Sequence, residues 1–437
     1  MDCAGFHLNN INSKTIESWE QCKKEDRRQK RKVKKIFFLY IYNIMEQIHK
    51  TYKFRLYPNE KQEELLLKHF GCTRWVYNHF LCEHNEQYKN NEKTDNFYQQ
   101  EKKLVELKKQ EEYQWLNEVN AQSLLCSLRD LDNGFAGFFK QKKGYPTFKS
   151  RKDKNTFEVP QHFKIENGRI FIPKFLEGIK VKIDRKVKGD IKHMTITKSK
   201  TGKYYVSILT VQERKELPKT GKSVGLDLGI KDLVITSDGQ KFENNKYINK
   251  YEKEIKHEQR YLSHKTKGSK RYENQVIKIA KIYEKISNCR NDTLHKISYQ
   301  IVRDYDIICI EDLNVNGMVK NHKLAKQIED ASWGNFVRML QYKSDWYGKN
   351  VVKIDRFYPS SKICHVCGEK NENLKLSDRE WTCDHCGTTH DRDINASINI
   401  LNEGLRISGM VVPSTQAEAQ IRHSLRNAQA CEVCSSM

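Results

Sequence analysis

Four cysteines in the C-terminal part of the chain have the spacing of a metal site. They form two Cys-x-x-Cys pairs, CHVC and CDHC, with 15 residues between them: Cys364, Cys367, Cys383 and Cys386. Each pair can place two thiolates on one tight turn, and two such turns complete a tetrahedral Zn²⁺ site. Because four protein ligands close the coordination shell, the spacing predicts a structural zinc ion. His365 and His385 lie inside the pairs, and we interpret them as incidental rather than as ligands.

Three acidic residues stand where a carboxylate could bind a second kind of metal. Asp227 lies within the apolar stretch SVGLDLGIKD, Glu311 directly follows the apolar run IICI, and Asp393 stands in DRDINASINI near the start of an expected helix. A buried carboxylate is costly unless it is paired or binds a metal. One such acid is usually structural or solvated, but together they favour a carboxylate cluster. Oxygen ligands suit Mg²⁺ or Mn²⁺, and two such ions can activate a water and stabilise the leaving oxygen of a phosphodiester.

These acids are far apart in the sequence, so their convergence constrains the fold. Glu311 follows Asp227 by 84 residues, and Asp393 follows Glu311 by 82. They converge only if the strands that carry Asp227 and Glu311 are neighbours and the helix after Asp393 packs over them. Asp312 should point to the other side of its strand. For Asp391 the sequence leaves open a helix cap, a salt-bridge partner and a metal ligand.

Composition favours a polyanionic partner. The 437-residue chain has 79 Lys and Arg against 56 Asp and Glu, a formal net charge of +23. Such an excess is typical of nucleic-acid-binding proteins, although ribosomal and membrane-surface proteins share it. Aromatic residues make up 10%, which implies a folded core rather than a disordered basic tail. No run of 18 apolar residues exists, so we expect no membrane span.

The other nine of the 13 cysteines show no disulfide-like framework. This usage suits a reducing compartment, so we expect a cytoplasmic protein. Cys431 and Cys434 form a further pair in a polar tail, where a third metal knuckle is the less favoured interpretation. Residues 1–44 include a basic run at 23–35, and we interpret them as an extension outside the main fold.

The hydrophobic pattern divides the chain into four zones, and the length predicts more than one domain. A strand-like alternation at 51–59 stops at Pro58, and a helical pattern runs from residue 60 to about residue 140. Alternating strands with Asn-Gly and Thr-Gly turns follow at 157–211. From residue 223 on, short apolar strands alternate with long helical stretches, which predicts an α/β domain.

As an ordered set, the motifs resemble the TnpB (OrfB) family of transposon-associated RNA-guided nucleases, which are relatives of compact type V CRISPR effectors. The resemblance covers about residue 50 to residue 403 and is carried by TYKFRLYPNEKQ, GYPTFKS, GLDLGIKD, IEDLN, WGNFVRMLQYKSDWYG, CHVCG, CDHCG and DRDINAS. It implies a multidomain α/β plus β-barrel protein, in which an RNase H-like RuvC nuclease domain is interrupted by a zinc ribbon-like module. It further implies that Asp227, Glu311 and Asp393 are the catalytic acids and hold a pair of Mg²⁺ ions.

The resemblance also implies an order of domains along the chain. After the basic extension at 1–44, a wedge β-barrel (45–59 and 144–216) is split by a helical recognition domain (60–143). The RuvC-like domain (217–358 and 390–403) is interrupted by the zinc-binding module (359–389). A flexible C-terminal tail is expected at 404–437.

Two partners are implied by the resemblance, a guide RNA made from the transposon end and double-stranded target DNA. The candidate nucleic-acid contacts combine cations and aromatics near the wedge and recognition parts: Tyr52, Lys53, Arg55, Arg74, Trp75 and Tyr77. A dense Lys/Arg series at 250–296 is typical of a surface that follows a guide–target heteroduplex, and a solvated helix face would look similar.

The expected function is an RNA-guided DNA endonuclease that reads a short motif beside its target and cuts both strands in one RuvC site. A compact type V CRISPR effector shares this domain plan, and the genomic locus would distinguish it. A non-cleaving RNA-guided DNA-binding repressor is disfavoured by the intact acidic trio. A DNA-joining transposase is disfavoured by the zinc-interrupted arrangement.

Overall fold

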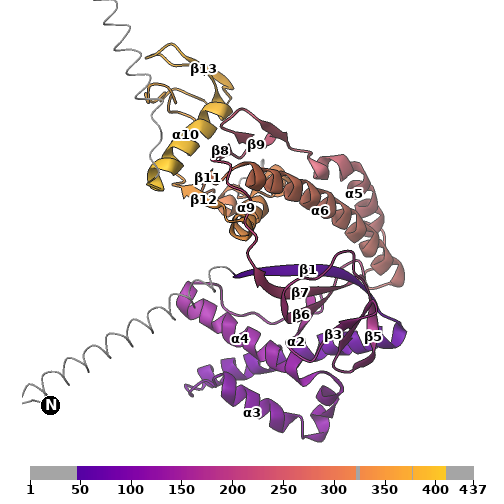
Figure 1. Ribbon diagram of the computed structural model, residues 1–437. Coiled ribbons are helices and arrows are strands. Elements are labelled where there is room, and N and C mark those ends of the chain that lie inside the picture. Colours follow the sequence, from indigo (N-terminus) through magenta and orange to yellow (C-terminus); the bar gives the residue numbers. More distant parts are fainter. Residues whose placement is uncertain (1–46, 321–324, 376, 410–437) are drawn as a thin grey trace, which may run out of the picture.

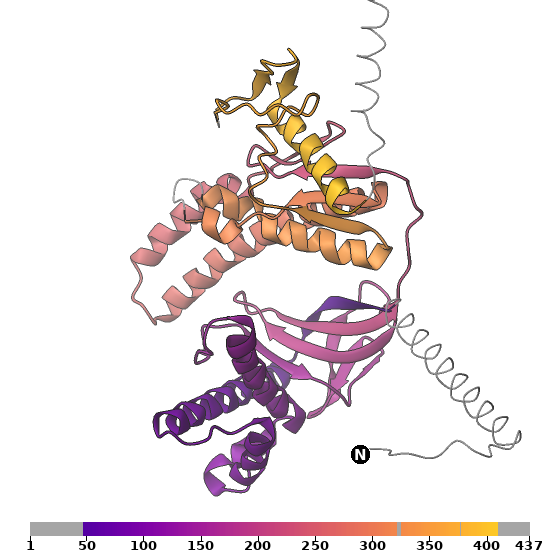
Figure 2. The same ribbon diagram turned by 90° about the vertical axis from the view of Figure 1, so that its left-hand side faces the viewer.

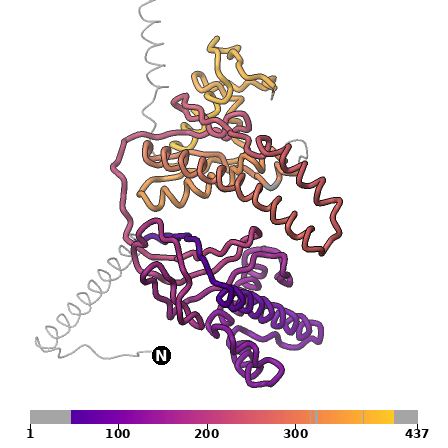
Figure 3. Tube along the Cα trace, turned by 90° about the vertical axis from the view of Figure 1, so that its right-hand side faces the viewer, coloured from indigo at the N-terminus to yellow at the C-terminus, as the bar shows by residue number. Residues whose placement is uncertain are grey.

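The computed structural model describes residues 47–320, 325–375 and 377–409, which form two bodies joined by one crossing of the chain (Figure 1). Figures 2 and 3 show that crossing at the side of the molecule. No helix within the described ranges is long and apolar enough to cross a membrane. The expected N-terminal extension at 1–44, most of the expected tail, and the pair Cys431 and Cys434 lie outside the described residues.

The first body is built on a seven-stranded antiparallel sheet of order β2-β6-β7-β1-β5-β4-β3. Its strands are β1 (Gln47–Tyr57), β2 (Asn155–Val159), β3 (Lys164–Glu166), β4 (Arg169–Ile172), β5 (Phe175–Lys182), β6 (Asp190–Lys198) and β7 (Tyr204–Glu213). β1 is central although about 100 residues separate it from the next strand, so a single sheet joins both expected wedge segments. Since β2 and β3 are edge strands, the sheet is an open half-barrel, which supports the expected β-barrel in this coarser form.

Local sequence explains the turns of this sheet. Asn167 and Gly168 both have positive φ, 50° and 69°, as a type I′ hairpin turn requires, and they join β3 to β4. Gly202, with φ 78°, lies in the turn between β6 and β7. Both hairpins were predicted from their dipeptides, and the structure confirms them.

A helical layer is inserted between β1 and β2. It consists of α2 (Glu60–Lys89), α3 (Phe97–Leu107), the 3₁₀ helix η1 (Glu111–Glu118) and α4 (Ala121–Gln141), which lie beside the half-barrel in Figure 1. α2 starts at a capping box in which Asn59 and Gln62 satisfy each other's backbone N–H groups. Apolar positions spaced three and four residues apart on α2 and α4 form the core of the helical layer. This core includes Val76, Phe80, Leu124 and Leu128.

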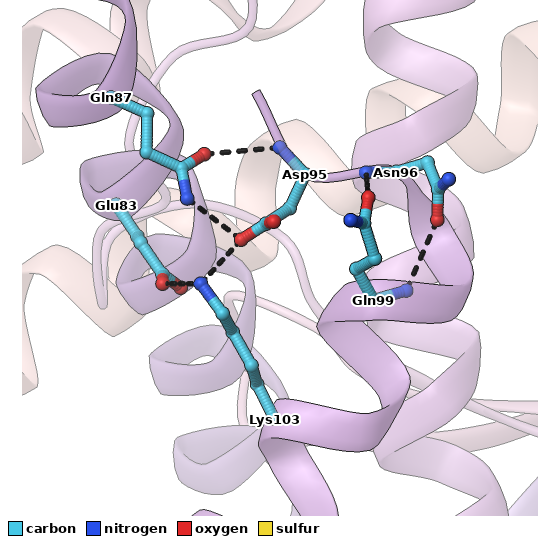
Figure 4. A network of polar contacts seen from close by, with 6 residues as sticks. All are labelled: Glu83, Gln87, Asp95, Asn96, Gln99 and Lys103. Atoms are coloured by element: carbon cyan, nitrogen blue, oxygen red, sulfur yellow. Dashed lines mark hydrogen bonds and ion pairs between the residues drawn. The ribbon is translucent and has the colours of Figure 1, made fainter. Parts of the chain in front are cut away.

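A polar network ties the start of α3 to the end of α2 (Figure 4). Lys103 forms ion pairs with Glu83 and Asp95, and the Nε2 of Gln87 donates to Asp95 at 2.7 Å. Asn96 and Gln99 form the capping box at the start of α3. The network therefore fixes the angle at which the two helices meet.

The second body is built on a five-stranded sheet of order β10-β9-β8-β11-β12. β8 (Ser223–Asp227), β9 (Asp232–Thr236) and β10 (Lys241–Glu243) are antiparallel neighbours, whereas β11 (Ile307–Glu311) and β12 (Asn350–Ile354) run parallel to β8. The helices of this body are α5 (Tyr247–Ser263), α6 (Lys270–Asp304), α7 (Val315–Met318), α8 (Ala325–Ala331), α9 (Trp333–Tyr347) and α10 (Arg392–Ile407). A small two-stranded sheet, β13 (Glu380–Thr382) and β14 (Thr389–Asp391), precedes α10.

Alternation along the strands decides which helix covers which face. Val224 and Leu226 of β8 lie in the core formed with α6 and α9. Cys309 of β11 lies in a separate core with Ile400 of α10, on the opposite face. α10 continues through Ile407, four residues past the end expected for the nuclease segment at residue 403, and its last buried residue is Gly404.

The two bodies contact each other through polar side chains. Glu284 of α6 accepts from Lys203 at 2.9 Å and from the hydroxyl of Tyr205 at 3.3 Å, both on β7 or the turn before it. The indole Nε1 of Trp346 on α9 donates to the carbonyl oxygen of His49 on β1 at 3.0 Å. The half-barrel therefore lies against the α6 and α9 side of the second body.

Candidate functional site

Asp227 and Glu311 end two neighbouring parallel strands. The register of β8 and β11 pairs Leu226 with Ile310, so the two acids are the next residues along their strands. Asp227 lies two residues after Gly225, and Glu311 lies two residues after Cys309. Since alternate residues of a strand point to the same face, both acids lie on the face that α10 covers. The neighbouring strands required for convergence are therefore present.

Asp393 reaches this face because α10 packs directly onto the two strands. A Cβ added to Gly225 would lie 2.0 Å from the carbonyl oxygen of Ser397, and one added to Gly404 would lie 2.3 Å from Sγ of Cys309. Glycine at both crossing points thus allows the helix to approach the sheet at backbone distance. Asp393 lies in the first turn of α10, on the side of the strand ends.

The pKa of Asp227 shows that the three carboxylates influence one another. Burial, together with the charges of Glu311 and Asp393, raises the pKa of Asp227 to about 7. Burial also raises the pKa of Glu311, and a hydrogen bond of 2.5 Å from the Ser360 hydroxyl to its Oε1 opposes that shift. Like charges gathered in this way are unfavourable without cations. Nη1 of Arg379 lies 3.4 Å from Oδ2 of Asp393, and the charge of Arg392 opposes the rise in the pKa of Asp227.

The two neighbouring acids have other partners. Asp391 is the N-cap of α10, where its Oδ1 accepts from the backbone N–H of Asp393 at 3.0 Å, and its Oδ2 lies 2.7 Å from Nζ of Lys241. The structure thus supports two of the alternatives for Asp391, the helix cap and the salt bridge. Asp312 pairs with Arg356 at 2.7 Å and is partly exposed, as expected for the other side of β11.

The four cysteines converge. Their sulfur atoms all lie within 4.8 Å of one another, and Sγ of Cys364 is 3.6 Å from that of Cys386, as is Sγ of Cys367 from that of Cys383. Zn–S bonds of about 2.3 Å in a tetrahedron place sulfurs about 3.8 Å apart. The arrangement can therefore hold one metal ion. Among the described residues this is the one group of His, Cys and acidic side chains with such close spacing, so the three carboxylates are farther apart.

His390 is a residue of this site that the sequence reasoning missed. Its Nε2 lies 3.1 Å from Sγ of Cys364, and its ring contacts those of His365 and Trp381. With the proton on Nε2, it donates to the thiolate and stabilises its charge. Its side chain is 3% exposed. A histidine directly before the acidic motif is the signal that could have found it.

Two asparagines of α10, also missed, hold the cysteine module onto the helix. Asn395 Nδ2 donates to the carbonyl oxygen of Ile363 at 2.7 Å, and its Oδ1 accepts from the backbone N–H of His365 at 3.0 Å. Asn399 donates to Ile363 at 2.6 Å and to Ser360 at 2.8 Å. Their spacing of four residues on an otherwise apolar face is the available sequence signal.

The candidate nucleic-acid contacts divide into buried and accessible groups. Tyr52 is 5% exposed in the core of the half-barrel, and Tyr77 is 7% exposed beneath the ammonium of Lys149. Burial leaves little ring surface for a base, so these two are corrected to core residues. Lys53 is exposed, whereas Arg55 is half-buried and donates to the carbonyl oxygen of Tyr204 at 3.1 Å.

Arg74 lines a cavity of about 630 Å³ between α2, α4 and β2. Its Nη1 donates to Oδ1 of Asn155 at 3.3 Å. Trp75, half-buried, stacks on His79 within the helical layer, with ring centroids 4.6 Å apart. The accessible candidates are thus the cations rather than the aromatics.

Comparison with protein families gives three matches along the chain. The model described as a helix-turn-helix domain of OrfB matches residues 45–93, the OrfB model described as a probable transposase matches 206–322, and the Cas12f1-like TNB domain matches 333–400. A solved structure, the cryo-EM structure of the Cas12f1–sgRNA–target DNA complex, covers 81% of this chain and 99% of that chain at 14% identity with a TM-score of 0.33.

Two curated relatives each match more than four fifths of the chain. A putative RNA-guided DNA endonuclease of Streptomyces pristinaespiralis is 38% identical over 369 residues, which is 84% of this chain and 92% of the relative. The putative RNA-guided DNA endonuclease InsQ of Escherichia coli (strain K12) is 34% identical over 372 residues, 81% of this chain and 92% of the relative. With the ordered motifs and the converging acids, these matches show that the chain belongs to the TnpB (OrfB) family.

Proposed function

We propose that the protein is an RNA-guided endonuclease of a transposon that cuts double-stranded DNA beside a short adjacent motif. The observation that carries the proposal is the position of Asp227 and Glu311 at the ends of neighbouring parallel strands, with Asp393 brought over them by α10. The names of the two curated relatives support the same activity.

The sheet supports an RNase H-like, RuvC-type nuclease domain. Three antiparallel strands are followed by two strands parallel to the first, in the order β10-β9-β8-β11-β12, and a C-terminal helix covers the face with the acids. In the proposed organisation, residues 217–358 and 390–407 form this domain and 359–389 form the zinc module. Residues 45–59 and 144–216 form the wedge, and 60–143 form the recognition domain.

Asp227, Glu311 and Asp393 fit Mg²⁺ as ligands. Their donor set consists of oxygens only, and the pKa of Asp227 is raised by burial and by the charges of Glu311 and Asp393, a repulsion that a cation would relieve. Bound Mg²⁺ would supply an activated water and stabilise the leaving oxygen. Ser360 donates to one oxygen of Glu311, while Asp391 and Lys241 fix the start of α10.

The four cysteines fit Zn²⁺ in a structural role. All four ligand positions are protein thiols, which leaves no position for a substrate. The module carries Arg379 next to Asp393, and α10 holds it through Asn395 and Asn399. In this proposal the zinc ion orders the cysteine module, and the module supports Asp393.

A guide RNA from the transposon end is the proposed RNA partner. The net charge of +23 provides the electrostatic attraction, and Lys53, Arg55 and Arg74 are the proposed contacts near the half-barrel. A compact type V CRISPR effector is the second candidate, favoured by the match of residues 333–400 to the Cas12f1-like TNB domain. A neighbouring repeat array, instead of a transposon end, would support it.

The test is a cleavage assay with the RNA that copurifies with the protein. That RNA should be sequenced and a plasmid library carrying its target beside random flanks should be cut only in the presence of Mg²⁺. Asp227→Ala should bind the same target without cutting it. Cutting without RNA, or by the Asp227→Ala variant, would contradict the proposal.

A further inference from the structure

Aromatic side chains are exposed together at the far ends of α2 and α4. Phe138 and Phe139 lie in the last turn of α4 and Tyr145 in the loop that follows, with 37%, 70% and 44% of their surfaces exposed. The ring of Phe138 lies 5.1 Å from that of Phe139 and 5.3 Å from that of Tyr145, measured between centroids. Tyr88, 74% exposed in the last turn of α2, lies one helical turn after Asn85, which accepts a hydrogen bond from the Tyr145 hydroxyl at 2.6 Å. We name these four residues the aromatic platform.

The platform rests on a rigid base. Phe135, 8% exposed, lies under Phe139 with its ring stacked 3.9 Å from His84 of α2. The Tyr145 hydroxyl donates to Oδ1 of Asn85 at 2.6 Å, which fixes the loop to α2. The rings are therefore held in place before any partner arrives, and a partner that stacks on them loses less entropy than it would on mobile side chains.

Positive charge surrounds the platform. The segment 138–154, FFKQKKGYPTFKSRKDK, contains seven Lys and Arg against one Asp. Lys140, Lys142 and Lys143 are exposed beside the rings, and the stem of Lys143 lies across Gly137. Lys149 of this segment already forms a salt bridge with Asp130 at 3.6 Å, and its ammonium lies over the ring of Tyr77. Most of the cations thus remain available to an anionic partner.

This combination selects among partners. Flat rings with exposed faces bind flat apolar groups, and the surrounding lysines require that those groups be attached to a polyanion. Unpaired nucleotides meet both conditions, because each base offers a π face and each phosphate a negative charge. A duplex does not, since its bases already stack on each other. A purely apolar protein surface would leave the lysines without partners.

We infer that the aromatic platform binds unpaired nucleotides of the RNA partner by stacking them on Phe139 and Tyr88, while the lysines of the same segment hold their phosphates. The identity of the polyanion as RNA rests on the proposed function. The stacking surface itself rests on the exposure, ring geometry and charge described above, and none of the carboxylates or cysteines takes part in it.

The test measures binding of a fluorescent single-stranded 12-nucleotide RNA to the full-length Asp227→Ala protein, freed of nucleic acid in high salt. Phe139→Ala should weaken binding about 10-fold, and Phe139→Trp should restore it, because stacking on one ring contributes at least that factor. Tyr98→Ala is the matched control, since Tyr98 is 71% exposed on α3 in the same helical layer but lies outside the platform. It should bind as the parent does.

Two results would overturn the inference. One is equal affinity of Phe139→Ala and the parent, with both proteins showing the same thermal unfolding. The other is loss of self-association in Phe139→Ala, seen by light scattering, with RNA affinity unchanged, which would make the platform a contact between two copies of the chain. Because binding is measured without cleavage, failure of the proposed nuclease activity would leave this result interpretable.

Discussion

Gly225→Ala should disable cleavage without touching a carboxylate. The added Cβ would lie 2.0 Å from the carbonyl oxygen of Ser397, against about 3.4 Å for an ordinary contact. That oxygen belongs to the backbone of α10, so no side chain can rotate away. The helix must therefore retreat by about 1.4 Å, and Asp393 moves with its first turn.

The magnitude follows from that displacement. A misplacement of about 1 Å at a reacting centre can cost about 100-fold in rate, so the single-turnover cleavage rate should fall by at least that factor. Overpacking of this kind should also lower the free energy of unfolding by about 1–3 kcal/mol. RNA-guided DNA binding should remain near that of the parent, because the half-barrel and helical layer are untouched.

The assay compares plasmid cleavage and DNA binding by the same preparations. Gly71→Ala is the matched control, since its added Cβ in helix α2 meets nothing within 4 Å. A second perturbation at the other crossing point, Gly404→Ala, should be partly rescued by Cys309→Gly, which removes the side chain it strikes. If folded Gly225→Ala cut at the parental rate, the reasoning that glycine sets the position of Asp393 would be refuted.

Three further outcomes are expected. Asp227→Ala, Glu311→Ala and Asp393→Ala should each abolish cleavage and keep target binding in a gel-shift assay, whereas Asp312→Ala should cut nearly normally. Elemental analysis should find about one zinc per chain, and Cys383→Ser should lose it; full retention would contradict the metal assignment. Burial lowers the pKa of Lys343 to about 8, so stability should rise with pH between 8 and about 10.4, by about 3 kcal/mol in total. Denaturant titrations of Lys343→Met should lack that rise.

The sign of the Lys343 effect follows from its surroundings. Its Nζ donates to the carbonyl oxygen of His295 and to Oγ of Ser298, and no carboxylate of the described residues pairs with it. The folded protein therefore releases the proton more readily than the unfolded chain does. Between the two pKa values the unfolded state binds more protons, so raising the pH favours folding.

The acids and cysteines could be found from the sequence because each stands at a point where local pattern and chemistry conflict. Asp227 and Glu311 follow apolar residues that alone would predict only a buried strand. The Cys-x-x-Cys spacing is dictated by the geometry of a tight turn. Such signals lie within a few residues of the site, so a single sequence is sufficient to detect them.

The rest depended on contacts between distant segments. Nothing in the local sequence near Tyr52 indicates whether its ring faces the interior of the half-barrel or the solvent, because both faces of an alternating strand carry aromatics and cations. His390 acquires its role only when the fold brings it 3.1 Å from Cys364. The open edges of β2 and β3 are likewise set by the length of the strands and their register, which alternation alone does not fix.

The two proposed metal sites are coupled through one helix. α10 uses Gly404 and the backbone beside Gly225 to contact the sheet, and it uses Asn395 and Asn399 to hold the cysteine module on another face. Its N-terminus is fixed by Asp391 and is directly continuous with β14 of that module. Loss of the zinc ion would therefore release the start of the helix that carries Asp393. In the proposed enzyme, a structural metal next to a catalytic carboxylate would make the geometry of the nuclease site depend on the folding of the module, although no thiol takes part in the proposed reaction.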